Sequence, residues 1–209
     1  MNPEYYYPEG KIEETINCLY NRTPEDNQWI YFYGNKIMMP MHWLKDEEIQ
    51  LLLPMIKIHN PSSVLEIGAG VLYNIWSISK KINAECWATD LSARVLDKAR
   101  AYAPNIHTRQ ADNAFLPFED KRFDVSYSMN TIEQCPKTYK QIIDELIRIT
   151  KKAVIMFEPS FELGSLYQKY LMWRKGYVRG IPKHRKLTEH YLLPVSKYYN
   201  RSACHMIKL

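Results

Sequence analysis

Short apolar segments alternate with amphipathic segments along this chain, and the alternation is clearest from about residue 63 onward. Continuous apolar stretches are typical of buried strands, whereas apolar residues that recur every three or four positions are typical of one helix face. The pattern predicts strands over 64–67, 85–89, 105–109, 123–128, 153–157, 190–195 and 202–208. It predicts helices over 9–20, 45–59, 72–82, 92–102, 138–149 and 162–176. Asn60-Pro61 ends the second of these helices, and Ser92 is placed to cap the fourth.

Strands that alternate with helices predict an α/β fold with a doubly wound, mostly parallel sheet, because parallel strands need crossover connections. In such sheets ligands bind at the carboxyl ends of the strands. The loops at 68–72, 90–92, 112–116 and 128–132 each follow a predicted strand. We therefore expect these loops to gather at one edge of the sheet and to form the functional site.

Composition narrows the class of protein. A chain of 209 residues suits one α/β domain with an added helical segment. The net charge of +5 is too small to indicate a nucleic-acid partner. The cysteines, at positions 18, 86, 135 and 204, form no C-x-x-C pair, and the histidines show no metal-ligand spacing, so we expect reduced thiols and no metal. The polar start and the short apolar stretch at 49–58 predict a cytoplasmic protein with no membrane partner.

The strongest local motif is the glycine-rich turn Gly68-Ala69-Gly70, directly after the first predicted strand of the sheet. Glycines let the backbone turn tightly and let a ligand approach the main chain. Glu66 precedes the turn, and its carboxylate would repel a dinucleotide pyrophosphate but suits the ammonium and sulfonium groups of S-adenosylmethionine. Tyr73 stands where the dinucleotide pattern needs glycine or alanine. A nicotinamide or flavin oxidoreductase is therefore disfavoured.

Two further acidic residues follow the next two predicted strands. Asp90 lies 22 positions after Gly68, where a carboxylate can accept both ribose hydroxyls of an adenosine ligand. Asp112 follows the third strand, where its carboxylate can accept from an adenine amino group. The segment 123–130 is a strand whose end would form the floor of the pocket near the sulfonium.

Together these segments resemble class I S-adenosylmethionine-dependent methyltransferases, over about 64–159. VLEIGAG resembles the glycine-rich motif of that family, ATDLS its acidic ribose loop, ADNAFLPFEDKRFDV its adenine loop and fourth strand, and SMNTIEQCP the loop that follows. The resemblance implies a Rossmann-like, seven-stranded sheet whose last strand, near 200–204, is antiparallel. Two positions depart from the family: Leu72 replaces a frequent third glycine, and Gln134 replaces a frequent histidine.

The resemblance also implies which residues bind the cofactor. Glu66, Gly68, Ala69 and Gly70 would contact its methionine portion. Asp90 and Leu91 would hold the ribose and adenine, and Asp112, Asn113 and Ala114 the adenine. Met129 and Asn130 would lie near the reacting centre.

The acceptor is expected to lie between an N-terminal cap, residues 1–60, and the methyltransferase core, residues 61–209. We predict that the acceptor-binding residues are Tyr31, Trp43, Glu158, Arg174 and Arg179. Candidate general bases or catalytic groups are Tyr33, His42 and His190. A carboxylate acceptor needs no base, whereas an alcohol or amine does. If the basic stretch 174–186 faces the pocket, an anionic small molecule or peptide is favoured, as in the O-methylation of a natural product or peptide.

Other functions remain open at this point. The basic stretch 174–186 with Tyr177 would allow RNA binding, although the fourth strand lacks the Asn-Pro-Pro-Tyr stretch of enzymes that methylate base amines. A catalytically inactive S-adenosylmethionine-binding module is compatible with Leu72. Cys135 is interpreted as a helix-start residue rather than a nucleophile, because nothing beside it supplies a base.

Overall fold

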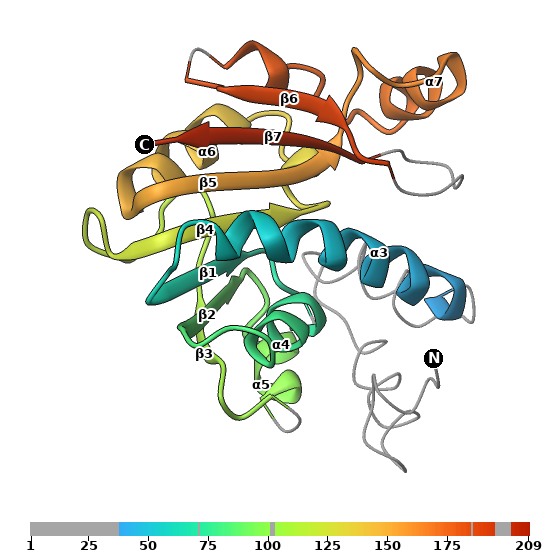
Figure 1. Ribbon diagram of the computed structural model, residues 1–209. Helices are drawn as coiled ribbons and strands as arrows, with labels where there is room; N and C mark the ends of the chain where they lie inside the picture. The colour runs from blue at the N-terminus through green and yellow to red at the C-terminus, as the bar shows by residue number, and fades with distance from the viewer. Residues whose placement is uncertain (1–37, 71, 101–102, 185, 195–201) are drawn as a thin grey trace.

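A seven-stranded sheet forms the centre of the protein, whose computed structural model describes residues 38–70, 72–100, 103–184, 186–194 and 202–209. The strands are β1 (Ser63–Ile67), β2 (Glu85–Asp90), β3 (His107–Gln110), β4 (Phe123–Met129), β5 (Thr150–Pro159), β6 (Glu189–Leu192) and β7 (Ser202–Lys208). Their order across the sheet is β3-β2-β1-β4-β5-β7-β6 (Figure 1). β7 runs antiparallel to both of its neighbours, β5 and β6, and the other strand pairs are parallel. The α/β fold with an antiparallel last strand is therefore confirmed.

Helices cover both faces of this sheet. One face carries α3 (Met38–Lys57), α4 (Tyr73–Ser79) and α5 (Ala93–Ala99), and the other carries α6 (Tyr139–Ile149). Alternate side chains of each strand point to opposite faces. Val64 thus joins the hydrophobic cluster under α3 and α4, while its neighbour Leu65 joins the cluster under α6. The two clusters fix which side of the sheet each strand-end residue faces.

Most predicted elements are present with shifted ends. The helix predicted over 138–149 is α6, and its predicted apolar face is buried through Ile142, Ile143, Leu146 and Ile149. The helix predicted over 45–59 begins earlier, at Met38. Ser92 accepts a hydrogen bond from the Val95 N–H at 3.4 Å, in keeping with its predicted capping role. The helix predicted over 9–20 lies outside the described residues.

α3 packs on the sheet rather than standing apart from it. Ile49, Leu52 and Ile56 are buried in the same cluster as β1 and α4. The described part of the predicted cap, residues 1–60, therefore contributes to the core of the fold. Residues 1–37 of that cap lie outside the described structure.

α7 (Leu166–Arg174) has an unusual position. It lies beyond the carboxyl ends of β5 and β6 (Figure 1), and its buried side chains are Gln168 and Met172. The apolar cluster under α6 is completed instead by Val178 and Ile181, the latter in the short helix η3 (Ile181–Lys183). This leaves α7 at the edge where the sequence places the functional site. Among the described residues, no helix has the length and apolar character needed to cross a bilayer.

Candidate functional site

The glycine-rich loop after β1 turns through left-handed backbone conformations. Gly68 has φ 60°, Gly70 has φ 51° and Leu72 has φ 63°. A non-glycine residue in this region costs about 1–2 kcal/mol. Leu72 is fully buried, and burying a leucine side chain stabilises by about 1.5–3 kcal/mol, which offsets that strain. The turn therefore forms although leucine replaces the third glycine.

Glu66 holds this loop from inside the protein. Its side chain is buried, and its carboxylate accepts hydrogen bonds from Asn74 Nδ2 at 2.7 Å, the Ile75 N–H at 3.0 Å and the Tyr127 hydroxyl at 3.1 Å. These bonds tie the end of β1 to the first turn of α4 and to β4. The predicted contact of Glu66 with a ligand stays a prediction, and the role that the described hydrogen bonds support is structural.

Asp90 joins the glycine-rich loop to the end of β2. One carboxylate oxygen accepts from the Gly70 N–H at 2.8 Å and the other from the Ser92 N–H at 3.0 Å. The Ala69 N–H donates to the Thr89 carbonyl at 2.9 Å, and this bond also joins the glycine-rich loop to the end of β2. A carboxylate that is half-exposed and held by backbone donors is well placed to accept further hydrogen bonds from hydroxyl groups. Leu91, beside it, is 52% exposed.

The loop after β3 lies next to the loop after β2. The Ala111 N–H donates to the Asp90 carbonyl at 3.0 Å, and Gln110 Nε2 donates to the Leu91 carbonyl at 2.9 Å. Asp112 is exposed and accepts from the Ala114 N–H at 2.9 Å, while Ala114 itself is buried. The amide oxygen of Asn113 lies 3.4 Å from Thr89 Oγ1. The structure thus brings together the predicted adenosine-binding residues.

The loop after β4 completes this edge. Met129 is buried, and Asn130 adopts φ 54° while its N–H donates to the Phe157 carbonyl at 2.9 Å. Gln134 Nε2 donates to the Asn130 carbonyl at 3.0 Å, so the glutamine that replaces the family's histidine supports this loop. Thr131 Oγ1 lies within 3.3 Å of the Gly68 carbonyl, which places the loop against the glycine-rich turn.

Glu158 was predicted to contact the acceptor, and the described hydrogen bonds of its side chain lie inside the protein. The side chain is fully buried at the end of β5, on the α6 side of the sheet. Its carboxylate accepts from Ser128 Oγ at 2.7 Å and from the backbone N–H groups of Thr131, Ile132 and Glu133 at 3.0–3.2 Å. Burial raises the pKa of Glu158 against the opposing effect of these hydrogen bonds. Glu158 fixes the loop after β4 and has no surface for an acceptor.

His190 lies in β6, which β5 and β7 separate from β4. Its Nε2 is 3.1 Å from Ser160 Oγ, and its ring stacks on His205 with centroids 4.6 Å apart. Burial lowers the pKa of His190 although the Glu162 carboxylate opposes this, so the ring is neutral near pH 7. A neutral imidazole can accept a proton. Its predicted role as a base stays a prediction.

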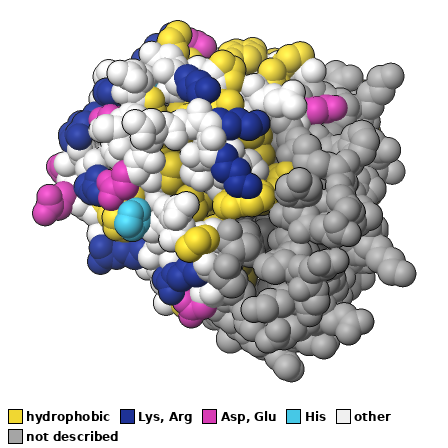
Figure 2. Space-filling model, turned by 60° about the horizontal axis from the view of Figure 1, so that its bottom comes forward, with side chains coloured by type: hydrophobic (Ala, Val, Ile, Leu, Met, Phe, Trp, Pro, Cys, Tyr) yellow, Lys and Arg dark blue, Asp and Glu magenta, His cyan; other side chains and the backbone are white. Residues whose placement is uncertain are grey.

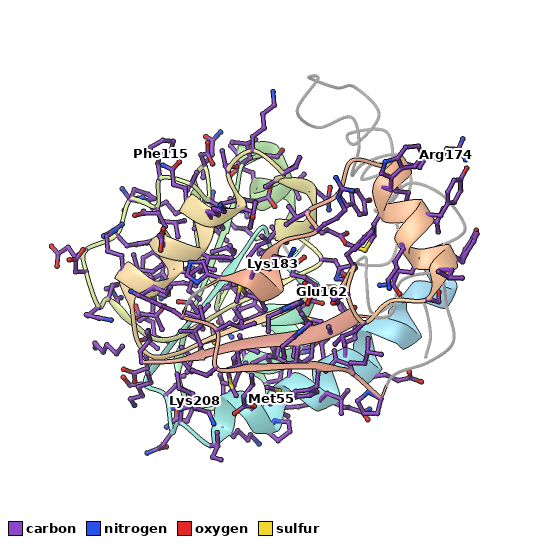
Figure 3. The ribbon with its side chains drawn as sticks, turned by 90° about the horizontal axis from the view of Figure 1, so that it is seen from above. Met55, Phe115, Glu162, Arg174, Lys183 and Lys208 are labelled. Carbon is purple, nitrogen blue, oxygen red and sulfur yellow. The ribbon has the colours of Figure 1, made fainter. Side chains whose placement is uncertain are left out.

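A groove of about 660 Å³ opens between the start of α6, the segment after β5 and the end of α7. Its lining combines aromatic side chains with charged ones: Pro136, Tyr139, Phe161, Glu162, Trp173, Tyr177, Arg179 and Lys183, with nearby backbone from 176–180. Figure 3 shows Glu162 and Lys183 over the middle of the molecule and Arg174 at the end of α7. Arg179 thus reaches this groove, whereas Arg174 is exposed outside its lining.

The remaining predicted residues cannot be placed in this site. Tyr31 and Tyr33 lie outside the described residues. His42 and Trp43 belong to α3, of which only the backbone is described at these positions. The sequence analysis did not single out Thr131 or the hydrogen-bond partners of Glu158. It also did not single out Tyr139 and Phe161, which line the groove. Thr131 lies within the SMNTIEQCP segment, but neither that motif nor any periodicity reveals these contacts, because they join segments far apart in the chain.

The class of protein follows from the order of the strands, the glycine-rich turn and the acidic residues at the strand ends. Together they define the fold of class I, Rossmann-like methyltransferases. Residues 64–153 match a family model described as a methyltransferase domain. The chain therefore carries a class I methyltransferase domain, and S-adenosylmethionine is the cofactor of this class. The acidic side chains fit that cofactor, because the carboxylates of Asp90 and Asp112 can accept hydrogen bonds from hydroxyl and amino groups beside a turn that glycines keep open.

Two curated relatives are named as methyltransferases. Malonyl-[acyl-carrier protein] O-methyltransferase of Pseudescherichia vulneris is 28% identical over 133 residues, 63% of this chain and 51% of that protein. The enzyme of the same name from Marinomonas sp. (strain MWYL1) is 26% identical over 129 residues, 60% of this chain and 47% of that protein. The chain thus spans about half the length of these curated relatives.

Two solved structures share the fold over most of the chain. One is from the complex between the Haloferax volcanii Trm112 methyltransferase activator and a methyltransferase, with a TM-score of 0.69, 15% identity, and coverage of 89% of this chain and 97% of that one. The other is magnesium protoporphyrin IX methyltransferase from Synechocystis PCC 6803 with bound SAH, with a TM-score of 0.66, 14% identity, and coverage of 93% and 99%.

Proposed function

We propose that this protein transfers a methyl group from S-adenosylmethionine to a carboxylate oxygen of a small-molecule or peptide acceptor in the cytoplasm. The cofactor supplies a methyl group that is already activated on a sulfonium, so the protein mainly has to align the acceptor and exclude water. Alignment of this kind contributes roughly 7–11 kcal/mol to barrier lowering. In this proposal Asp90, Asp112 and Asn113 hold the adenosine part, and the turn at 68–70 approaches the methionine part.

The groove beside β5 carries the acceptor assignment. Arg179 and Lys183 place two cations on a lining that also contains Tyr139, Phe161 and Trp173. Cations attract an anionic acceptor, and guanidinium groups bind carboxylates in a fixed geometry. Glu162 is the acidic member of the lining, so the two cations leave a net positive charge there. An anionic acceptor with an apolar or aromatic body fits this lining best.

A carboxylate acceptor also agrees with the shortage of a base near the glycine-rich loop. A carboxyl group is ionised at pH 7 and needs no proton removal. Glu66 and Glu158, two buried glutamates near this loop, are engaged in structural hydrogen bonds. His42, Tyr33 and His190 would be needed only for an alcohol or amine acceptor.

The curated relatives support the same choice. Both are named for O-methylation of malonyl-[acyl-carrier protein], at 28% and 26% identity. In our proposal residues 1–37 form the rest of the acceptor pocket, with Tyr31 and, from the start of α3, Trp43. The free thiols of Cys86, Cys135 and Cys204 suit a reducing compartment.

The test is methyl transfer from labelled S-adenosylmethionine to a panel of anionic metabolites and peptides, with mass spectrometry to detect the added methylene. A methyl ester is expected, which mild alkali hydrolyses with release of methanol. Arg179→Ala and Lys183→Ala should each raise the acceptor KM about tenfold or more, as expected for a lost charge-assisted contact. Lys57→Ala, at the exposed end of α3, is the matched control.

Each contrary outcome has a distinct meaning. Tight cofactor binding without transfer to any acceptor would favour an inactive binding module. An alkali-stable product would contradict the carboxylate assignment and bring His190 back as a base. Strongly salt-dependent RNA binding would favour RNA as the acceptor. On the face in Figure 2, however, Lys and Arg side chains lie among acidic and hydrophobic ones rather than in one continuous track.

A further inference from the structure

One side of α7 is apolar and exposed to solvent. Leu166 is 86% exposed, Trp173 63% and Tyr170 50%, at the three- and four-residue spacing that places side chains on one helix face. Leu163, just before the helix, is 38% exposed. The opposite side of the helix buries Gln168 and Met172. An ordinary surface helix buries its apolar side, whereas α7 leaves most of its large apolar side chains exposed.

The apolar residues are concentrated in this one place. Among the described residues, ten large hydrophobic side chains are exposed, and five of them fall within residues 163–173. The other five are separated along the chain: Ile58, Leu91, Phe115, Tyr191 and Leu209. Single exposed hydrophobic residues are normal, whereas a contiguous patch marks an interaction surface.

Basic side chains surround this patch. Residues 161–184 contain five Lys and Arg residues, at 169, 174, 175, 179 and 183, against one acidic residue, Glu162. Lys169 Nζ lies 5.9 Å from the ring centre of Phe161, and Lys175 Nζ lies 5.3 Å from that of Tyr177. Figure 3 shows side chains of α7 pointing away from the body of the molecule, with Arg174 labelled at the end of the helix. The partner of this surface must therefore accept both apolar side chains and positive charge.

We propose that α7 binds the surface of an anionic lipid membrane. Tyrosine and tryptophan are favoured at the boundary between headgroups and acyl chains, and leucines insert below it. Lysine and arginine stems extend along an apolar surface while their charged ends reach the anionic headgroups. A helix that protrudes beyond the sheet, as α7 does in Figure 1, can reach a flat surface without obstruction from the strands.

The residues of this patch also favour a lipid membrane over two other partners, a second copy of this chain and RNA. In a symmetric pair of chains, the same patch would face itself and bring Lys169, Arg174 and Lys175 close to their own copies, which is unfavourable. RNA would match the charges and the aromatic rings, but Leu163 and Leu166 offer no ring for stacking. An anionic lipid surface can accept the leucine, the aromatic and the basic side chains of this patch together. This inference departs from the sequence-based expectation of no membrane partner, which considered only segments that cross a bilayer.

Vesicle co-sedimentation tests the proposal independently of methyl transfer. The full chain is mixed with vesicles of phosphatidylcholine alone or of phosphatidylcholine with phosphatidylglycerol. We expect at least about tenfold tighter binding to the anionic vesicles, weakened by added salt. The double variant Leu166→Ser, Tyr170→Ser should lose about tenfold or more of this binding, and Lys169→Glu, Lys175→Glu should lose the preference for anionic vesicles.

Ile58→Ser is the matched control, because Ile58 is 81% exposed directly after the C-terminal end of α3, outside α7, and its loss should leave vesicle binding unchanged. Thermal unfolding of each variant confirms that it is folded. Absence of vesicle binding, or equal binding by the α7 variants, would overturn the proposal. Dimer formation or RNA binding that the α7 variants abolish, without vesicle binding, would assign this surface to that other partner and equally overturn it.

Discussion

Thr131 lies directly against Gly68, although 62 residues separate them in the chain. A methyl group placed on Gly68 would lie 2.2 Å from Thr131 Cγ2 and 2.6 Å from Thr131 Oγ1. Gly68 also has φ 60°, a conformation that side chains with a Cβ rarely adopt. The loop after β4 thus closes onto the glycine-rich turn after β1, and this contact sets the distance between the two loops that border the cofactor site.

Gly68→Ala should weaken S-adenosylmethionine binding and lower stability by about 2–4 kcal/mol, because left-handed strain and a steric clash act together. Calorimetry and thermal unfolding measure the two effects. Gly176→Ala is the matched control: Gly176 has φ 68° but no atom within 4 Å of the added methyl group, so only the strain remains. Thr131→Ala in the Gly68→Ala background should restore part of the loss; no coupling between the two sites would contradict the contact.

Asp90→Ala should weaken S-adenosylmethionine binding about 100-fold or more while the chain stays folded. The carboxylate holds the Gly70 N–H at 2.8 Å, so its loss removes the predicted ribose contact and loosens the turn. Titration calorimetry with circular dichroism checks both statements. Asp97→Ala, which removes an exposed carboxylate paired with Arg100, is the control. Tight binding by the Asp90 variant would sink the ribose assignment.

Glu158→Gln should cost about 2–4 kcal/mol of stability and reduce cofactor affinity, although this side chain touches no surface. A glutamine amide nitrogen would meet the backbone N–H groups of Thr131, Ile132 and Glu133, which need an acceptor. Chemical denaturation measures the loss. Glu119→Gln, at an exposed position, should change stability by less than about 0.5 kcal/mol. A stable Glu158 variant with normal affinity would show that the loop holds its position without this carboxylate.

His205 should make the protein sensitive to mild acid. Burial, and then the neighbouring His190, lower the pKa of His205 from 6.5 to about 3. Between these values the unfolded chain binds more protons, so stability is complete above pH 6.5 and falls as the pH decreases toward 3. The loss reaches about 3 kcal/mol by roughly pH 4.5.

His205→Phe should flatten this pH dependence, because phenylalanine keeps a flat ring in the stack and cannot take up a proton. His205 has no hydrogen-bond partner for either ring nitrogen in the described structure, so the apolar ring should not lower stability at pH 7.5. The test is to measure the free energy of unfolding of both proteins between pH 3 and pH 7.5. His107→Asn, at an exposed position, is the control. An unchanged pH profile in the His205 variant would contradict the assignment.

The sequence alone determined the strands, the helices and the glycine-rich turn, since each depends on local periodicity or on a backbone conformation that few residues adopt. It also placed Asp90, Asp112 and Asn113 at strand ends, because parallel strands bring their carboxyl ends to one edge. Leu72 could not be judged from the sequence. Its left-handed conformation is stable only because the core buries its side chain.

Only the tertiary structure showed which carboxylates hold distant segments of the fold together. Glu66 and Glu158 look like ligand-binding residues in the sequence, but both point inward to donors on other segments. The sequence also could not predict that the apolar side of α7 is exposed. Periodicity indicates that a helix has an apolar side, but it does not indicate whether the sheet lies against that side. The orientation of these carboxylates and the exposure of α7 both depend on contacts between segments far apart in the chain. The local spacing of residues does not predict such contacts.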